Sequence, residues 1–528
     1  MKIDGLKLNK LDHLFKYLNT IKYMKARQIG FQLLRRIYNP KYADVKGSLS
    51  SCPEIQWTTM GNHDAPSVEG STFRFSFLNQ SVVFRGAIDW NYAKNGKLWT
   101  YNLNYFDFLS DPALEDDLKT SLMRDFTSKR LEIKDGMESY PVSLRIINWI
   151  KYCSSNSLRE FDDFIYSQAC LLSKSFEYHL LGNHLLENAY SLLFAAFYFR
   201  DESFYDLASR VLREQLKEQI LADGAHFERS PMYQQILFTR LLDALHFSRQ
   251  DTWKTDLITR FETSAGQMLS WLLQISYRNG NVPMVNDCSP GSAPETRELQ
   301  RYATSMDIEP QPLDLGESGY RMVRKESYEC FLDLGNIGPD YIPGHAHSDT
   351  FNFEFYINGQ PLIVDTGIST YENNDTRQLE RSTSAHNTVK VDQIEQSEMW
   401  GAFRVARRAH IIELEERENY FRAIHDGYKS RSGVLHQREF EFKPNQVIIT
   451  DTLLGGASIP AVAYFHFPVD IHSTLVDNVC DIGESKIVVH KGISQLASYE
   501  KAERFNVRIK CQVLEVKFLG KLVVAIDL

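Results

Sequence analysis

The spacing of apolar residues divides the chain into two long stretches with different periods. Between Tyr140 and about Trp271, six runs of 15 to 21 residues place apolar side chains at every third or fourth position, which predicts amphipathic helices joined by short polar breaks. One of these runs, FDDFIYSQACLLSKSFEYHLL (161–181), is expected to form a single helix. From about Gly319 onward the period changes to two, as in strands separated by turns. We therefore expect a helical toroid or bundle followed by an antiparallel sandwich of roughly 200 residues.

The first part of the chain is less regular. Apolar residues at 11, 14, 15, 18 and 21 follow a helical stripe with lysines between them. Such a helix either docks onto the body of the protein or lies on an anionic membrane, and docking is the commoner fate. The aromatic-rich stretch from Ser50 to Asp135 is interpreted as a connecting segment that covers one end of the helical domain. The predicted domains are therefore 1–135, 136–315 and 316–528.

Composition narrows the class of protein. The chain has 528 residues, of which 43% are hydrophobic and 24% charged, so it has enough apolar residues for sizeable cores and is not disordered. A net charge of −9 argues against nucleic acid as the main partner. Seven scattered cysteines without a CxxC pair indicate reduced core residues rather than a disulfide framework or a cysteine zinc site. No signal-peptide core or membrane-spanning run is visible, which predicts a cytoplasmic protein, or a periplasmic one whose signal has been removed.

A possible metal-binding set lies in the first third of the β-rich stretch. GHAHSD contains His345 and His347, which would share one face if the segment were a strand. Asp365 closes the apolar run PLIVD, and His386 follows in SAHNTV. Two histidines and a carboxylate are an ordinary zinc shell, whereas an HxH pair alone in a loop is more often solvated.

Two further clusters lie at predicted helix junctions. LGNHLLENA carries Asn183, His184 and Glu187; Asn183 is a natural N-cap, and the other two would share a helix face. GAHFERSPMY brings His226, Glu228, Arg229 and Tyr233 to a helix start that Ser230 would cap. A tyrosine in a first helical turn is usually only a half-buried aromatic residue. Each cluster taken alone therefore has a structural explanation.

Five motifs in register resemble the heparinase II/III family of polysaccharide lyases, which is akin to oligoalginate lyases. They are NHxxEN, HFERSPMY, GHAHSD, PLIVDTG and SAHNTV. The N-terminal text KYMKARQIGFQLLRRIY resembles members encoded with bacterial surface-polysaccharide genes. The resemblance implies a multidomain α+β protein, with an incomplete (α/α) toroid followed by an antiparallel β-sandwich. It also implies β-elimination of a uronic-acid-containing polysaccharide, such as a glycosaminoglycan or capsular polymer, bound between the two domains.

The resemblance also assigns roles to residues. It implies that Tyr233 is a proton donor and often also the base, that Asn183 and His184 neutralise the uronate carboxylate or assist proton abstraction, and that His345 is catalytic. Glu187, Arg229 and Arg404 are candidates for substrate binding. His347, Asp365 and His386 match the ligands of one zinc ion, which would be structural or would fix the loop that bears His345.

The chemistry explains these residue types. Removing the C5 proton of a uronate places a second negative charge on an anion, so donors aimed at the carboxylate are needed. A tyrosine acting as base needs a nearby cation to lower its pKa, and His345, Arg229 or the metal would supply it. A glycoside hydrolase using Glu187 and Glu228, or a non-catalytic polysaccharide-binding or biosynthesis-associated protein, stays open. An acidic polysaccharide is the expected partner, membrane association is not expected, and the oligomeric state is open, with a homodimer among the alternatives.

Overall fold

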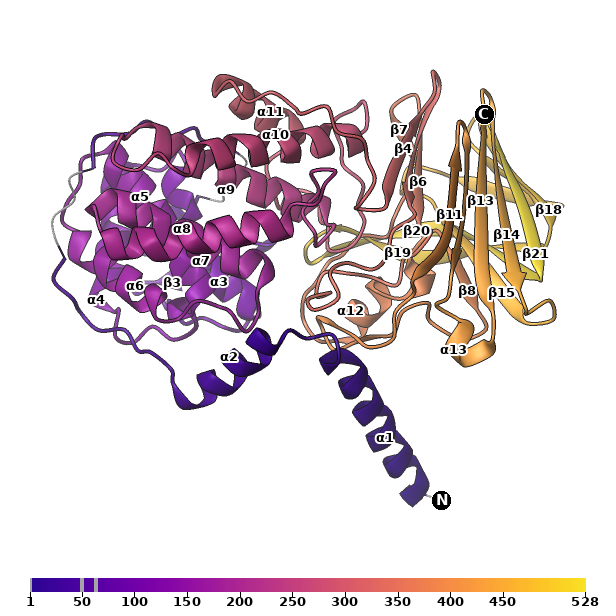
Figure 1. Cartoon of the computed structure of the whole chain (residues 1–528), viewed down its shortest axis with the longest axis horizontal. Coiled ribbons are helices and arrows are strands. Elements are labelled where there is room, and N and C mark those ends of the chain that lie inside the picture. Colours follow the sequence, from indigo (N-terminus) through magenta and orange to yellow (C-terminus); the bar gives the residue numbers. More distant parts are fainter. Residues whose placement is uncertain (1, 48–51, 61–64) are drawn as a thin grey trace.

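A computed structural model describes the whole chain except residues 1, 48–51 and 61–64. Figure 1 shows two bodies side by side, a cluster of helices and a stack of sheets, with helices α1 (Lys2–Ile21) and α2 (Ala26–Ile37) below them. The predicted fold class, an (α/α) toroid followed by an antiparallel β-sandwich, is confirmed.

The helical body is built from the runs that the apolar period predicts. Its long helices are amphipathic or wholly buried, and α7 is buried along nearly its entire length. The helices are α3 (Lys97–Tyr105), η1 (Asp107–Ser110), α4 (Asp116–Ser128), η2 (Asp135–Met137), α5 (Ser139–Ser155), α6 (Asp162–Ser173), α7 (Gly182–Phe199), α8 (Glu202–Gln219), α9 (Pro231–Arg249), α10 (Ile258–Ile275) and α11 (Thr296–Ser305).

One predicted helix is wrong in its extent. Within residues 161–181, helix α6 ends at Ser173, and the residues after it form a loop that leads to α7. The side chains of neighbouring helices hold this loop: the backbone N–H of Glu177 donates to Asn188 Oδ1, and the Ser139 hydroxyl donates to the carbonyl of Ser175. These tertiary hydrogen bonds replace the helical ones, which the apolar period alone does not reveal.

The segment before the helical body is more than the predicted connection. Three strands, β1 (Ser67–Glu69), β2 (Thr72–Phe77) and β3 (Gln80–Arg85), form an antiparallel sheet. Phe75 from this sheet is buried against Trp90 and Phe108, so the segment shares the core of the helical body.

The C-terminal body contains three larger antiparallel sheets. Their orders are β4-β5-β6-β7, β19-β20-β15-β8 and β11-β12-β13-β14-β21-β18-β17-β16, with a small β10-β9 pair beside them. The strands are β4 (Tyr320–Arg324), β5 (Tyr328–Asp333), β6 (Phe353–Ile357), β7 (Gln360–Ile363), β8 (Val389–Val391), β9 (Met399–Trp400), β10 (Arg404–Val405), β11 (Ile411–Arg417), β12 (Tyr420–His425), β13 (Leu435–Lys443), β14 (Gln446–Leu454), β15 (Pro460–His466), β16 (Ser473–Val476), β17 (Val479–Ile482), β18 (Ser485–Lys491), β19 (Ile493–Arg504), β20 (Val507–Leu519) and β21 (Lys521–Asp527). Short helices α12 (Asp375–Glu380), η3 (Thr383–Ala385) and α13 (Lys429–Ser432) lie in the connections.

The two bodies share a buried aromatic contact. Trp271 of α10 packs on Tyr320 of β4, and Tyr277, which follows α10, stacks on Tyr356 of β6. All four rings belong to one buried cluster. Burial of this apolar area fixes the helical body against the first sheet, so side chains from both bodies are held in defined positions. The predicted domain limits stay a prediction; residue 316 lies in the loop between α11 and β4.

Helix α1 forms as the apolar stripe predicts, and its last turns contact the C-terminal body. The Thr20 hydroxyl lies 3.2 Å from the carbonyl of Val405, and Trp400 Nε1 donates to the same hydroxyl. Within the described residues, no helix has both the length and the apolar character needed to cross a bilayer. Six of the seven cysteines are buried, as their scattered positions predict.

Candidate active site

Three segments bring the predicted catalytic residues together. Asn183 lies in the first turn of α7, Tyr233 in the first turn of α9, and His345 in the loop between β5 and β6. Helix starts and loops position side chains without the packing constraints of an element's middle, which is typical of active sites. The site is therefore built from both bodies.

His345 is at the centre of this group. Its ring lies 4.0 Å from the ring of Tyr233, between centroids. Its Nε2 is 3.3 Å from Glu228 Oε2 and 3.4 Å from Asn183 Nδ2. Its Nδ1 is 2.8 Å from Asp287 Oδ2. Because a carboxylate only accepts, Nδ1 carries the hydrogen, and Nε2 is the atom that faces the other catalytic candidates.

Asp287 holds the histidine pair in place. His347 Nε2 donates to Asp287 Oδ1 at 2.9 Å, and the guanidinium of Arg377 donates to both carboxylate oxygens at 2.5 and 2.7 Å. Burial alone would raise the pKa of Asp287, but Arg377 and the two histidines outweigh it and hold that pKa well below its ordinary value. Asp287 is therefore an ionised buried carboxylate with charged and polar partners on both oxygens.

The local structure of the HxH pair differs from the prediction. Residues 344–350 form a loop, not a strand. His345 and His347 nevertheless turn to the same side, because both imidazoles donate to Asp287. A shared acceptor rather than the pleat of a strand aligns the pair.

Tyr233 lies where the sequence predicts. The Ser230 side chain accepts from the backbone N–H of Tyr233 and caps α9, with Pro231 at its start. The Tyr233 hydroxyl is 3.1 Å from that of Tyr371. The expectation that a cation lowers its pKa is wrong: burial, followed by Tyr371 and Asp287, raises the pKa of Tyr233 well above 10. Tyr233 therefore holds its proton at neutral pH.

Asn183 is not the N-cap of α7, contrary to the prediction. The cap position is Leu181, whose side chain makes no capping hydrogen bond. The Asn183 backbone N–H donates instead to Glu228 Oε1 at 3.0 Å, and its Nδ2 donates to Glu228 Oε2 at 3.3 Å. Its Oδ1 is buried and has no hydrogen-bond partner among the described residues. The carboxylate of Glu228 therefore takes over the capping role and orients the Asn183 amide.

His184 points to a different carboxylate. Its Nδ1 is 3.2 Å from Glu177 Oε2, and its ring packs on Tyr140 with centroids 4.4 Å apart. Burial lowers the pKa of His184, but Glu177 outweighs this and leaves that pKa above 6.5. His184 is about one-third exposed, and its raised pKa favours the protonated ring, which suits contact with a bound anion.

Glu187 does not share the surroundings of His184. It is fully buried, and its Oε2 accepts from Arg240 Nε at 2.9 Å. Burial raises the pKa of Glu187, and Arg240 partly offsets this rise. Its partner is thus Arg240, which the sequence analysis missed, and a role of Glu187 in substrate binding stays a prediction.

Two predicted substrate-binding residues lie outside this group. Arg229 donates to the backbone carbonyls of Asn336 and Glu317, so it joins the two bodies. Arg404 lies over the ring of Trp400, on the side that carries α1. Neither guanidinium contacts Tyr233 or His345, and their role in binding stays a prediction.

The predicted zinc ligands fit a metal only in part. His347 Nδ1 and His386 Nε2 are buried and have no hydrogen-bond partner among the described residues, and the two ring centroids are 5.2 Å apart. Asp365 is engaged otherwise: its Oδ2 accepts from Asn352 Nδ2 at 2.6 Å and from His386 Nδ1 at 2.7 Å. In the described part of the chain, no set of three His, Cys, Asp or Glu is arranged to hold a metal.

Sequence reasoning missed several residues of the site. Asp287 lies in NVPMVNDCSPGSAPE, which indicates only a boundary loop. Its signal was a polar pair, Asn286 and Asp287, flanked by Val285 and Cys288, which are both fully buried in the structure. Tyr371 and Arg377 carry no motif, and only the fold brings them to Tyr233 and Asp287.

Two family descriptions cover almost the entire chain. Heparinase II/III N-terminus matches residues 21–311, and Heparinase II/III-like, C-terminal matches residues 308–504. Since the first match alone spans more than half of the sequence, the chain belongs to the heparinase II/III family.

Individual relatives are distant. The heparin-sulfate lyase of Pedobacter heparinus is 24% identical over 341 residues, which are 59% of this chain and 50% of that protein. The chain thus spans half the length of this curated relative. The structure of heparinase III has a TM-score of 0.64 and 16% identity, covering 84% of this chain and 79% of that one. The heparan sulfate lyase HepC mutant from Pedobacter heparinus has a TM-score of 0.59 and 18% identity, covering 84% and 79%. These similarities establish the fold.

Proposed function

We propose that the protein is a polysaccharide lyase that cleaves a uronic-acid-containing polymer by β-elimination. The observation that carries this proposal is the meeting of Asn183, Tyr233 and His345 from three segments, with His345 oriented by a buried carboxylate. The names of the relatives, heparin-sulfate lyase and heparinase III, support the same reaction class.

The geometry favours a division of roles. His345 Nδ1 donates to Asp287, and Nε2 is the nitrogen that faces Asn183 and Glu228. We assign Nε2 the role of taking the C5 proton, after a bound substrate replaces these contacts. Tyr233 retains its proton and is suited to protonate the leaving glycosidic oxygen. The Asn183 amide and the cationic His184 are suited to stabilise the charge that develops on the uronate carboxylate.

The alternative of a glycoside hydrolase receives less support. Such an enzyme needs two carboxyl groups that face the scissile bond from opposite sides. Glu187 is paired with Arg240, and Glu228 accepts from the backbone and the side chain of Asn183. Both carboxylates are buried and each is already hydrogen-bonded within the protein, Glu187 through Oε2 alone, which argues against either as a catalytic acid or base.

The direct test is incubation of the protein with heparan sulfate, hyaluronan, alginate and chondroitin while ultraviolet absorbance is followed. A lyase produces an unsaturated uronate, which absorbs, and a hydrolase does not. We expect rising absorbance with at least one polymer. New reducing ends without absorbance would contradict the proposal and favour hydrolysis.

A zinc ion is a separate proposal. The orphaned nitrogens of His347 and His386 support it, because buried imidazole nitrogens without partners are ordinary zinc ligands. Burial lowers the pKa of His347 to about 3, which keeps this ring neutral as metal ligation requires. Asp365 would join only by exchanging its present hydrogen bonds. When bound, the ion would tie the loop that bears His345 to the sandwich.

Metal analysis tests this proposal without reference to activity. The purified protein is expected to carry about one zinc per chain, and His347→Ala should lose it. His345→Ala should keep the metal and lose turnover. Equal loss of zinc in both variants would contradict the assignment of His347 to the metal and His345 to catalysis. A metal-free wild-type protein that gains no thermal stability from added zinc would contradict the zinc site itself.

A further inference from the structure

A cavity of about 840 Å³ adjoins the catalytic group, although none of Asn183, His184, Tyr233 and His345 lines it. Two lining residues connect it to that group. Arg240 is the partner of Glu187, one turn beyond His184 on α7. The ring of Phe505 packs on Tyr371, whose hydroxyl contacts Tyr233. The cavity therefore lies close to the catalytic residues, one side-chain contact beyond those that touch them.

The charges that line this cavity balance. Four lining residues are cationic and four are carboxylates, namely Lys119, Lys151, Arg240 and Arg504 against Asp107, Asp116, Asp243 and Glu295. A cleft for a densely sulfated polymer needs a surplus of cations, because each sulfate carries its own negative charge. This cavity has no such surplus.

Two of the lining cations, Lys151 and Arg240, are already paired with carboxylates. Asp243 Oδ2 lies 2.9 Å from Lys151 Nζ and 3.6 Å from Arg240 Nη1. Arg240 is held further by Glu187. Asp243 itself is only 1% exposed, so its charge is directed to these two cations rather than to water.

The other cations offer little to a sulfate. Lys119 is buried and lies 3.6 Å from Asp116. Arg504 is exposed at the end of β19 and forms no ion pair with any residue that the structure describes. One exposed cation at the edge does not compensate a sulfate deep in the cavity.

What the cavity does offer is typical of sugar recognition. Aromatic rings and side-chain amides both line it, and they suit the C–H faces and hydroxyl groups of a neutral sugar. The aromatic and amide residues include Trp57, Phe108, Tyr152, Asn79, Asn102 and Asn148.

We propose that this cavity is a subsite that selects an uncharged sugar unit next to the uronate, and that Asp243 is its specificity-determining residue. This proposal rests on the proposed function and names its substrate class: a uronate polymer whose neighbouring sugar carries no sulfate. Asp243 excludes sulfate by occupying Lys151 and Arg240, which would otherwise be the cations available to it.

The test compares oligosaccharides of one backbone, unsulfated and O-sulfated, such as chondroitin and chondroitin sulfate, by calorimetric Kd and by kcat/KM from absorbance. We expect the unsulfated form to bind at least about tenfold more tightly, because an unpaired charge in a desolvated site costs more than that factor. Equal or tighter binding of the sulfated form would overturn the subsite proposal. Preferential binding without any unsaturated product would support the subsite and overturn the proposed lyase reaction instead.

A substitution at Asp243 sharpens the test. Asp243→Asn keeps the size of the side chain, leaves Lys151 without this carboxylate and leaves Arg240 with Glu187 alone. The preference for the unsulfated form should therefore shrink by about tenfold or more. A folded variant with an unchanged preference would contradict the assigned role of Asp243. If Asp243→Asn does not fold, the binding of unsulfated and sulfated oligosaccharides to the wild-type protein still tests the subsite proposal.

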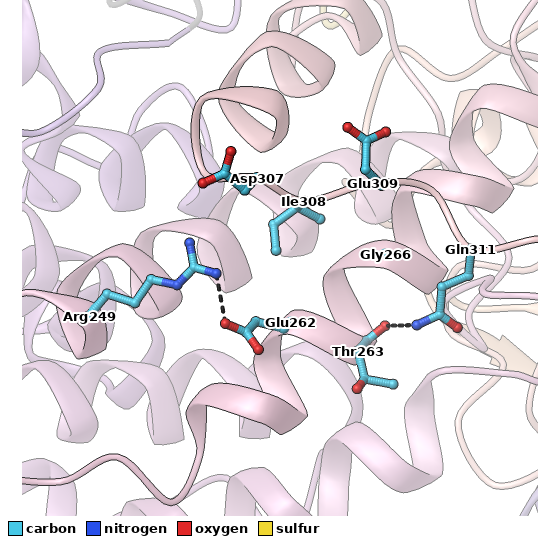
Figure 2. Close-up of a pocket in the computed structure, with 8 residues that line it drawn as sticks. All are labelled: Arg249, Glu262, Thr263, Gly266, Asp307, Ile308, Glu309 and Gln311. Atoms are coloured by element: carbon cyan, nitrogen blue, oxygen red, sulfur yellow. Dashed lines mark hydrogen bonds and ion pairs between the residues drawn. The ribbon is translucent and has the colours of Figure 1, made fainter.

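A matched control lies on the outer side of the helical body. Figure 2 shows a smaller cavity of about 390 Å³, in which Arg249 of α9 donates to Glu262 of α10 at 2.7 Å. Glu262→Gln also neutralises the acid of an acid–arginine pair that involves α9, but it does so outside the proposed subsite. Glu262→Gln should leave the ratio of the Kd values for the sulfated and unsulfated oligosaccharides unchanged. A change as large as that caused by Asp243→Asn would show that the preference does not depend on the position of Asp243 in the cavity.

Discussion

At the scale of residues, the site depends on one buried carboxylate that belongs to neither predicted motif. Asp287 accepts from His345, His347 and Arg377, and Arg377 is fully buried. Two imidazoles and a guanidinium from the C-terminal body are thus oriented by one acid in the loop that leaves the helical body. The position of His345 Nε2 follows from this arrangement.

Removal of that charge should be costly. Asp287→Asn leaves the guanidinium of Arg377 buried without its counter-ion, and breaking such a pair costs about 3–5 kcal/mol of unfolding free energy. Denaturant unfolding measures the change. Asp481→Asn, which removes an exposed carboxylate 3.6 Å from Lys486, is the control and should cost less than about 1 kcal/mol. Equal costs in the two variants would contradict the role given to Asp287.

Tyr233→Phe removes one hydroxyl and leaves the ring against His345. The Ser230 cap uses the backbone of residue 233, so the helix start should persist and Tm should change little. Loss of the proton donor should lower kcat by ~10² or more. Tyr166→Phe on α6, whose hydroxyl donates to Asp201, is the control for loss of a tyrosine hydroxyl. Normal turnover of Tyr233→Phe would remove this residue from the mechanism.

Substitutions of Asn183 separate its two contacts. Because its Nδ2 donates to Glu228, Asn183→Asp places two carboxylates together and should lose both stability and turnover. Asn183→Ala avoids the repulsion, so it should retain more stability than the Asp variant while still losing turnover. Melting temperature and absorbance assays decide the ranking. A stable, active Asp variant would contradict both the contact with Glu228 and the proposed contact with the substrate carboxylate.

At the scale of elements, the stability of the loop between α6 and α7 depends on pH through the ion pair of Glu177 and His184. His184 has a pKa raised above 6.5 after Glu177 outweighs burial, and Glu177 has a pKa lowered below 4.5 because His184 outweighs its burial. The contribution of His184 is fully present below about pH 6.5 and is lost as pH rises through its folded pKa. The contribution of Glu177 is present above about pH 4.5 and is lost as pH falls through its folded pKa.

Glu177→Gln should therefore lower Tm most between these limits. The difference from wild type should shrink as pH rises through the folded pKa of His184, and again as pH falls through that of Glu177. Thermal unfolding over a pH series measures it. A difference that is constant with pH would mean that the pair is not charged in the folded protein.

The same loop shows which parts of the fold the sequence predicts. Apolar periods of 3.6 and 2 locate the long helices and most strands, because burial of one face is a local property of the sequence. The end of α6 at Ser173 and the loop form of GHAHSD depend on partners far along the chain, such as Asn188 and Asp287. A periodic pattern carries no information about those partners.

At the scale of the whole molecule, the site exists because two bodies meet. Helix starts of the toroid supply Asn183 and Tyr233, and a loop of the sandwich supplies His345. The motifs alone predict these three residues through their resemblance to a family. They do not predict Asp287, Tyr371 or Arg240, since each acts through a contact that only the folded chain creates.

The central claim is β-elimination, and the products formed in water labelled with heavy oxygen test it most directly. Elimination adds no water, so mass spectrometry should show an unsaturated product that is lighter than the hydrolysis product by one water and carries no label. Tyr233→Phe at the same concentration should give far less of this product. Labelled, saturated products from the wild-type protein would contradict the account, because they require hydrolysis.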